Sequence, residues 1–151
     1  GRSAHHGDSF RAQVLYAGHA VGLKEDLSGI ENLEFLLQLR GVRVPRARLE
    51  EAVAAVGLAK RRLLPARRLS AGQRRRIGLA RLSLDPAACW ILDEPLTALD
   101  VEGAAILGRS VEAHLARGGV ALKEGHLYAG WSVELDVQQR RGPLFRRWGR
   151  R

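Results

Sequence analysis

The feature that most constrains the fold is a short apolar run that ends in two acids and a proline, residues 89–95 (CWILDEP). Four apolar residues in a row are typical of a strand covered on both faces, as in a parallel sheet. Pro95 cannot continue such a strand, so Asp93 and Glu94 should emerge at its carboxyl end, where open parallel sheets place their ligands. Adjacent carboxylates at that edge suit a divalent cation and a base that activates water.

A second motif, LSAGQ at residues 69–73, precedes this strand. Ser70 and Gln73 fit the S-x-x-Q capping box, which predicts that a helix begins at Ser70. Gly72 would let a ligand approach the exposed backbone N–H groups of the first turn, where an anion can sit. Apolar residues at helical spacing continue the helix as far as Asp85-Pro86, which should end it.

Three strings in order, LSAGQ (69–73), LDEP (92–95) and TALD (97–100), resemble the signature motif, Walker B motif and D-loop of ATP-binding cassette (ABC) ATPases. This resemblance implies an α/β fold of the P-loop NTPase type, with a parallel sheet and a helical subdomain. We expect residues 1–139 to form part of such a domain and residues 28–85, approximately, to form its helical subdomain. A second capping box at Ser28 and a helix start at Pro45 would supply that subdomain's first two helices.

Further strings narrow the resemblance. VLYAGH (14–19), GLK (22–24), ENL (31–33) and WILDEPLTA (90–98) are similar to the haem-exporter ATP-binding subunits of the cytochrome c maturation system. The resemblance implies an ATP-binding, ATP-hydrolysing subunit that lies peripherally on the cytoplasmic face of the bacterial inner membrane. Its implied partners are transmembrane permease subunits and a second ABC ATPase subunit, the two ATPases forming a head-to-tail dimer around ATP and Mg²⁺.

The same resemblance assigns roles to individual residues. Glu94 would polarise the attacking water, Asp93 would hold Mg²⁺, and His126 would steady the γ-phosphate. The match at His126 is imperfect, because residues 123–125 (KEG) replace the apolar and threonine residues expected before it. His19 stands at the position of the Q-loop glutamine. The residues implied to contact nucleotide are His19, Ser70, Ala71, Gly72, Gln73 and Asp100.

The sequence contains no P-loop, because Gly-x-x-x-x-Gly-Lys-[Ser/Thr] needs a Gly-Lys pair and none of the three lysines follows a glycine. The sequence also contains no methionine. We therefore expect an N-terminally truncated domain that does not hydrolyse ATP by itself. Two alternatives remain. The first is a non-catalytic ABC partner subunit or truncated pseudo-ATPase. The second is a basic nucleic-acid-binding protein.

Charge is distributed unevenly along the chain. The formal net charge is +9, and six arginines without any acid occupy residues 140–151, which leaves +3 for the rest. Those last residues are expected to be a disordered basic tail. Residues 60–81 hold nine basic residues and no acid, which we interpret as a solvated cationic face. The next alternatives are attraction of phosphate at a nucleotide site and attraction to an acidic membrane surface. No aromatic-lined sheet or zinc-ligand spacing supports sequence-specific binding, so a nucleic-acid partner is not expected.

The remaining elements follow from local pattern. Residues 1–12 show no periodicity and should form a loop, whereas residues 13–17 should form a strand. Asp100 can cap a helix that ends at Gly118-Gly119, and residues 120–122 should form the next strand. Residues 131–138 alternate between apolar and polar, which predicts a half-buried strand. No uncharged apolar run approaches the ~18 residues that a membrane span needs.

Overall fold

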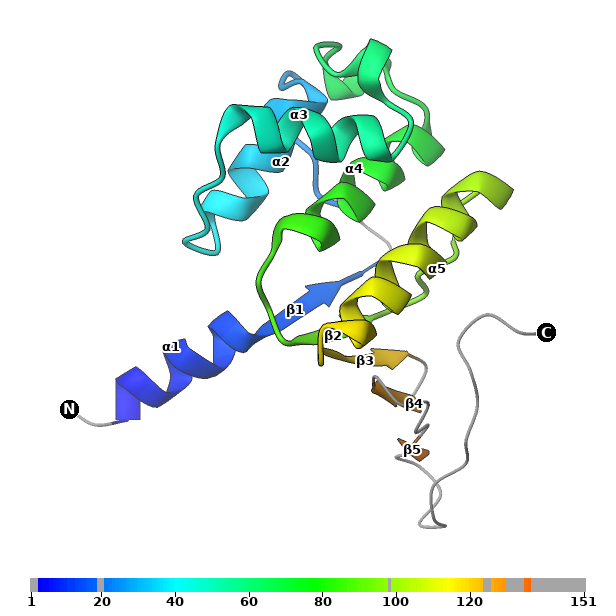
Figure 1. Cartoon of the computed structure of the whole chain (residues 1–151). Coiled ribbons are helices and arrows are strands. Elements are labelled where there is room, and N and C mark those ends of the chain that lie inside the picture. Colours follow the sequence, from blue (N-terminus) through cyan, green and yellow to red (C-terminus); the bar gives the residue numbers. More distant parts are fainter. Residues whose placement is uncertain (1–2, 19–20, 98, 124–125, 130–134, 137–151) are drawn as a thin grey trace. The chain divides into compact units, whose positions relative to one another are not determined.

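The computed structural model describes residues 3–18, 21–97, 99–123, 126–129 and 135–136, with the backbone alone at positions 3–6, 8, 126–129 and 135–136. Contacts divide the chain into two compact units, coloured by sequence in Figure 1. The sheet unit consists of Gly1–Gly18, Pro86–Pro95 and Gly108–Arg151. The helical unit consists of His19–Asp85 and Leu96–Leu107.

The sheet unit contains a sheet with the strand order β1-β2-β3-β4-β5. β1 (Val14–Ala17), β2 (Cys89–Leu92) and β3 (Val120–Lys123) run parallel, which confirms the three parallel strands predicted from their apolar runs. β4 (His126–Ala129) and β5 (Leu135–Asp136) pair antiparallel, so the sheet is parallel only through β3. Trp90, in the central strand of the parallel part, lies opposite Leu15 and Ala121, and all three side chains are buried.

The helix α1 (Ser3–Gln13) contradicts the prediction that residues 1–12 form a loop. A helix satisfies its own backbone hydrogen bonds whether or not it buries an apolar face. The side chains described in this one, at positions 7 and 9–13, form no such face, and the largest of them, Phe10, is exposed. Hydrophobic periodicity therefore could not reveal it.

The helical unit is built on α2 (Gly29–Gln38), α3 (Arg46–Ala55) and α4 (Ala71–Leu84), with α4 packing against both of the others. Two 3₁₀ turns, η1 (Ala59–Arg61) and η2 (Ala66–Arg68), connect α3 to α4. Apolar residues at helical spacing meet in the core of this unit and are almost wholly buried. They are Ile30, Leu33, Leu37, Leu49, Val53, Ile77 and Leu82.

Both predicted capping boxes are present. The Ser28 hydroxyl accepts the backbone N–H of Glu31 at 3.2 Å, and the Glu31 carboxylate accepts the N–H of Ser28 at 2.7 Å. The same exchange joins Ser70 and Gln73 at the start of α4. Each box satisfies two backbone donors that the first turn of a helix leaves without partners.

Buried polar groups fix the ends of α2. The Asn32 side chain is fully buried, and its Nδ2 donates to the carbonyls of Lys24, Leu27 and Ser28, while its Oδ1 accepts the N–H of Lys24. Asn32 thus holds the loop that leads into α2. At the other end, Arg40 donates to the buried Asp85 carboxylate that follows α4. This pair ties the ends of α2 and α4 together.

Some predictions fall outside the described residues. Only residues 135–136 of the predicted strand at 131–138 are described, as β5, and the tail at 140–151 lies wholly outside. α5 (Val101–Ala116) follows Asp100 as predicted. None of the helices in the described part of the chain combines the length and the apolar content that crossing a bilayer requires.

Candidate nucleotide site

The two acids predicted to serve the site do follow β2, and both are exposed. The backbone N–H of Asp93 donates to the carbonyl of Ala17 at 3.0 Å, which extends the β1–β2 pairing one residue past the strands. The backbone of Asp93 is therefore fixed by the sheet, although its side chain reaches solvent. The carboxylates stand at the carboxyl edge of the parallel strands, as the sequence predicted.

A tyrosine that sequence reasoning missed contacts this pair. Tyr16, on β1, donates its hydroxyl to Asp93 Oδ2 at 2.8 Å. This hydrogen bond to a carboxylate, together with partial desolvation and the negative charge of Asp93, raises the pKa of Tyr16. No local sequence pattern marks this contact, because Tyr16 lies near the end of one strand and Asp93 just past the end of another that is distant in sequence. Tyr16 thus holds one oxygen of an exposed carboxylate.

Glu94 has an unusual backbone. Its φ is +43°, and it is the only non-glycine residue with positive φ in the described part of the chain. Such a conformation is uncommon for a residue with a side chain and is found preferentially where function fixes the backbone. The buried Pro95 follows directly and restricts the same turn. Glu94 thus stands in a turn and not in the extended backbone of β2.

The donor chemistry at this edge fits Mg²⁺. Carboxylate oxygens are the ligands that Mg²⁺ prefers, and the ion usually takes only one or two of them, completing its shell with water and substrate phosphates. Asp93 could offer such a ligand from a backbone that the sheet holds. Among the described residues no three His, Cys, Asp or Glu side chains converge to hold a metal.

Trp90, on β2, packs against a histidine of α5. The rings of Trp90 and His114 stack with centroids 3.8 Å apart and an interplanar angle of 7°. His114 Nε2 lies 3.0 Å from the Val120 carbonyl, so this nitrogen carries the proton in the neutral ring, because a carbonyl only accepts. Burial lowers the pKa of His114, and the carbonyls of Val120 and Ala88 offset part of that effect. The stack fixes α5 against the strand that carries the carboxylates.

The LSAGQ motif forms the start of α4 in the helical unit. Ser70 and Ala71 are exposed, and Gly72 and Gln73 are half-buried. The Ser70 hydroxyl accepts the N–H of Gln73 at 3.1 Å. The first turn therefore presents a hydroxyl and the positive end of a helix dipole to solvent, an arrangement that favours an anionic ligand.

Asp100 is held within the helical unit by Arg76 of α4. Arg76 Nη2 lies 2.9 Å and 2.8 Å from the two Asp100 carboxylate oxygens, and 3.4 Å from Glu102. Asp100 Oδ1 also accepts the N–H of Gly103 at 2.8 Å, so it caps α5 as predicted. This cap and the Arg76 guanidinium lower the pKa of Asp100. The Asp100 carboxylate thus already pairs with residues of its own chain, and its predicted contact with nucleotide stays a prediction.

Of the two histidines predicted for the site, the structure describes only His126. His19 lies outside the described residues. His126 is the first residue of β4, opposite Lys123 in an antiparallel pair, and its predicted contact with the γ-phosphate stays a prediction. Asp93 and Glu94 belong to the sheet unit, and the other described site residues, which are Ser70, Ala71, Gly72, Gln73 and Asp100, belong to the helical unit.

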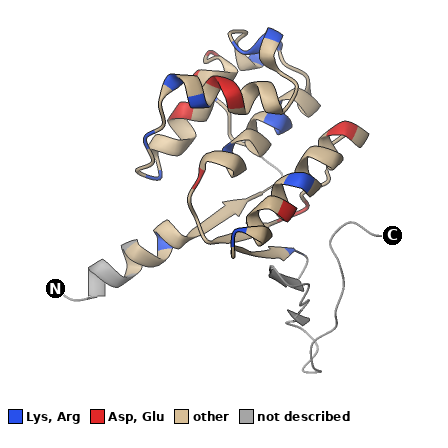
Figure 2. Cartoon of the chain, in the orientation of Figure 1, with Lys and Arg blue, Asp and Glu red and all other residues tan. Residues whose placement is uncertain are grey.

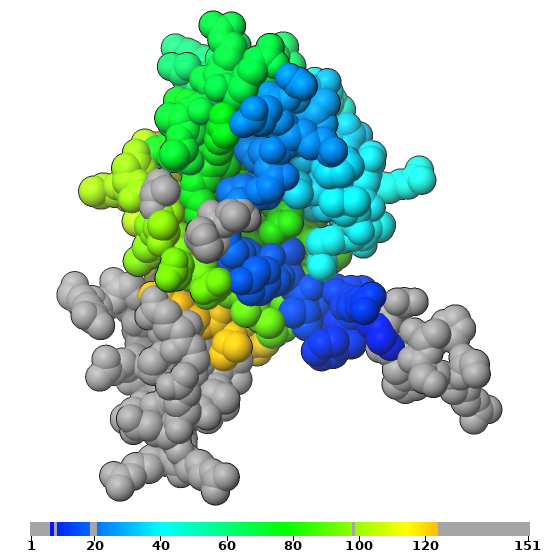
Figure 3. All heavy atoms as spheres, turned by 180° about the vertical axis from the view of Figure 1, so that it is seen from behind, coloured from blue at the N-terminus to red at the C-terminus, as the bar shows by residue number. Residues whose placement is uncertain are grey.

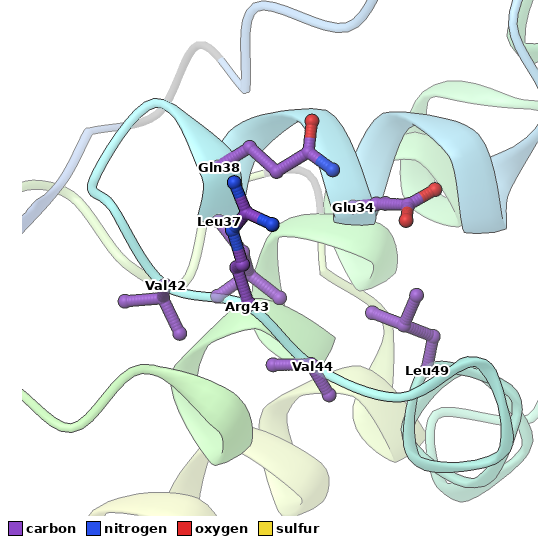
Figure 4. A pocket seen from close by; sticks show the side chains of 7 residues that line it. All are labelled: Glu34, Leu37, Gln38, Val42, Arg43, Val44 and Leu49. Carbon is purple, nitrogen blue, oxygen red and sulfur yellow. The ribbon is translucent and has the colours of Figure 1, made fainter.

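The helical unit also carries a surface cavity of about 240 Å³, which the sequence did not reveal (Figure 4). It lies between α2, the segment at 42–44 and the start of α3. Aliphatic side chains line it together with the polar ends of Glu34, Gln38 and Arg43. This volume can take one large side chain of another molecule.

The sequence matches known proteins. Residues 2–97 match the family model described as ABC transporter. The chain is 51% identical over 122 residues to the cytochrome c biogenesis ATP-binding export protein CcmA of Methylococcus capsulatus, an alignment covering 81% of this chain and 59% of that protein. It is 44% identical over 120 residues to the CcmA of Nitrosomonas europaea, covering 80% of this chain and 56% of that protein. The chain therefore spans somewhat over half the length of these relatives.

Solved structures resemble the fold. A putative ABC transporter ATP-binding protein from Pyrococcus furiosus aligns with a TM-score of 0.65 and 22% identity, over 74% of this chain and 56% of that one. The ATP-binding cassette MJ0796, solved as a dimer in a post-hydrolysis state bound to ADP and Pi, aligns with a TM-score of 0.66 and 19% identity. That alignment covers 80% of this chain and 55% of MJ0796.

Proposed function

The chain belongs to the ABC transporter family, and from that premise we propose that it is an ATP-binding subunit of an exporter that serves cytochrome c biogenesis, with haem as the cargo. The observation that carries the proposal is the pair of exposed acids at the carboxyl edge of β1 and β2, in the string that resembles a Walker B motif. The identity of 51% to a CcmA protein supports the branch of the family.

Asp93 and Glu94 would divide the chemistry between them. Bound Mg²⁺ would neutralise charge on the β- and γ-phosphates, and Asp93 is the residue that would hold it. Tyr16 would keep the Asp93 carboxylate in place through its 2.8 Å hydrogen bond. Glu94 would accept a proton from the attacking water as general base, and it is exposed in the turn after β2. His126 would steady the γ-phosphate, and His19 would sense the metal and nucleotide.

The start of α4 would act on a different nucleotide. In a head-to-tail dimer, Ser70, Ala71, Gly72 and Gln73 would close on ATP held by a second ABC subunit, using the hydroxyl and the exposed N–H groups of the first helical turn. MJ0796 was solved as a dimer, which supports such an assembly. Asp100 would keep its position relative to α4, because Arg76 of α4 binds its carboxylate within the same unit.

The other partners would be transmembrane permease subunits, with this chain peripheral on the cytoplasmic face of the inner membrane. The cavity on α2 and α3 is a surface where one permease side chain could anchor, because aliphatic residues line it together with an acid and a base. The names of the relatives as export proteins support this placement.

The isolated 151-residue chain would not hydrolyse ATP. Backbone N–H groups and the lysine of a P-loop supply much of the positioning of the β- and γ-phosphates, and no Gly-Lys pair occurs in this sequence. The signature helix remains complete, so the chain could still complete the site of another subunit. A non-catalytic partner subunit is therefore the second candidate.

A complementation assay tests the proposal. A full-length CcmA relative whose own signature serine has been replaced should be inactive, and adding this chain should restore part of its ATPase rate. Ser70→Ala in this chain should abolish the rescue, whereas Ser83→Ala, also exposed and on α4, should not. If the Ser70→Ala chain restores the ATPase rate as well as the parent chain does, the rescue does not depend on Ser70 and this part of the proposal is wrong. Turnover by the isolated chain would contradict its proposed inactivity.

Glu94 is tested in a chimera that supplies a P-loop from the same relative. Glu94→Gln keeps the size of the side chain and removes the base, so hydrolysis should fall by on the order of 10²–10⁴. ATP binding, measured by equilibrium dialysis, should persist. An unchanged rate would place the general base at another residue.

A further inference from the structure

The nine basic residues between positions 60 and 81 do not form one cationic face, contrary to the interpretation from sequence. Three of them are paired within the helical unit. Arg67 pairs with Asp26, Arg74 lies 3.6 Å from Glu25, and Arg76 holds Asp100 and Glu102. Arg75 is buried, and Arg81 has its pKa lowered by burial. The four that remain are exposed and form no ion pair with any residue that the structure describes: Lys60, Arg61, Arg62 and Arg68.

Three of those cations are consecutive, and an exposed leucine follows them. Lys60, Arg61 and Arg62 occupy η1 and the position after it, and Leu63 is 61% exposed. We call residues 60–63 the basic turn. Figure 2 shows blue on this short helical turn at the top of the view, and the space-filling view in Figure 3 shows the chain around residue 65, coloured green, at the surface. Exposed aliphatic and basic side chains are therefore adjacent on one short protruding segment.

The backbone of the basic turn is anchored. Arg62 Nη1 donates to the Ala59 carbonyl at 2.8 Å, and the N–H of Leu64 donates to the carbonyl of Arg61 at 3.0 Å. The Arg62 carbonyl accepts the N–H of Ile30, in the first turn of α2, at 3.4 Å. Three exposed basic residues are thus consecutive on an anchored backbone, and no carboxylate in the described part of the chain forms an ion pair with them. An anionic surface would supply the opposite charge.

We propose that the basic turn contacts the anionic headgroups of a lipid bilayer, with Leu63 inserted at the boundary between headgroups and acyl chains. Basic residues beside an exposed aliphatic residue are typical of segments that lie on anionic membranes. Single-stranded RNA is a poorer partner, because RNA-binding surfaces stack bases on aromatic side chains and residues 59–68 contain none. The inference adds a lipid contact to the proposed function and needs only the membrane location from it.

Vesicle binding by the full chain tests the proposal. The probe is phosphatidylcholine vesicles with and without phosphatidylglycerol, and the readout is cosedimentation at low salt. Replacing Lys60, Arg61 and Arg62 together by Gln should weaken binding to the anionic vesicles roughly a hundredfold, the change expected from three charges at about 1 kcal/mol each. The matched control replaces three other exposed arginines, Arg46, Arg48 and Arg109, so that the net charge falls by the same amount.

A second pair of variants leaves charge unchanged and so separates insertion from attraction. Leu63→Ser should weaken binding about tenfold through lost apolar contact. Leu39→Ser, at a leucine that is 69% exposed elsewhere in the helical unit, should have little effect. Equal losses for the two triple variants would overturn the proposal, since binding would then follow net charge. An inert Leu63→Ser would overturn it too, as would variants of the basic turn that lose binding to an RNA homopolymer but keep binding to vesicles.

Discussion

His114 should make the stability of the sheet unit depend on pH. Its ring is 4% exposed, stacks on Trp90 and holds the Val120 carbonyl at 3.0 Å. Burial lowers its pKa in the folded chain, and the charge of Arg117 acts in the same direction. In the unfolded chain the imidazole should titrate near its ordinary pKa of about 6.5. The test therefore lowers the pH through the range in which the unfolded chain binds this proton and the folded chain does not.

The sign follows from linkage. Above pH about 6.5 the ring is neutral in both states and its contribution to stability is complete. Below that pH the unfolded chain takes up protons that the folded chain resists, so the free energy of unfolding falls as the pH falls toward the lowered pKa of the folded state. Each pKa unit between the two states corresponds to about 1.4 kcal/mol. The loss ends once the folded state is protonated as well.

His114→Phe isolates this effect. Phenylalanine keeps a ring against Trp90 but leaves the Val120 carbonyl without its donor, which should cost about 1–3 kcal/mol near neutral pH. The variant has no group to titrate, so its disadvantage relative to the parent should shrink as the solution is acidified. Hydrogen exchange of the β2 and β3 amides, corrected for the intrinsic rate at each pH, measures the local free energy of opening.

The amides of α2 serve as an internal control, because the described residues of the helical unit contain no histidine. Their opening free energies should change alike in both proteins. Parallel pH dependence of the β2 amides in the parent and in His114→Phe would refute the reasoning. It would mean that the pKa of His114 is the same in the folded and unfolded chains.

Three further predictions concern single contacts. Gly119→Ala should destabilise the sheet unit by about 1–3 kcal/mol, because a Cβ there would overlap the His114 ring, and a lowered urea midpoint would report it. Ser28→Ala should cost about 1 kcal/mol through loss of the α2 cap, whereas Ser28→Gly should cost only a few tenths, as measured by the same unfolding; equal costs would contradict the cap. Asp93→Asn should lower the pKa of Tyr16 toward its ordinary value, since the carboxylate raises it, and an unchanged phenolate absorbance titration would disprove the contact.

The family and the local elements could be predicted from sequence because their signals lie within a few residues of one another. Each capping box joins a serine to a residue three positions later, as at Ser28 and Glu31. The apolar run before Asp93 and Glu94 predicted both β2 and the edge at which these acids stand. Hydrogen bonds and hydrophobic patterns of this range are specified before the chain makes any tertiary contact.

The tertiary structure alone decided which side chains meet. Tyr16 and Asp93 are 77 positions apart, and Arg76 and Asp100 are 24 apart, so no local pattern marks either contact. The stack of His114 on Trp90 depends on how α5 packs against β2. The nine basic residues at 60–81 look alike in sequence, but carboxylates from distant segments pair with three of them. Arg75 is buried, and burial lowers the pKa of Arg81. Long-range packing sets these outcomes, because the free energy of each contact depends on the partner and the solvent exposure that the completed fold supplies.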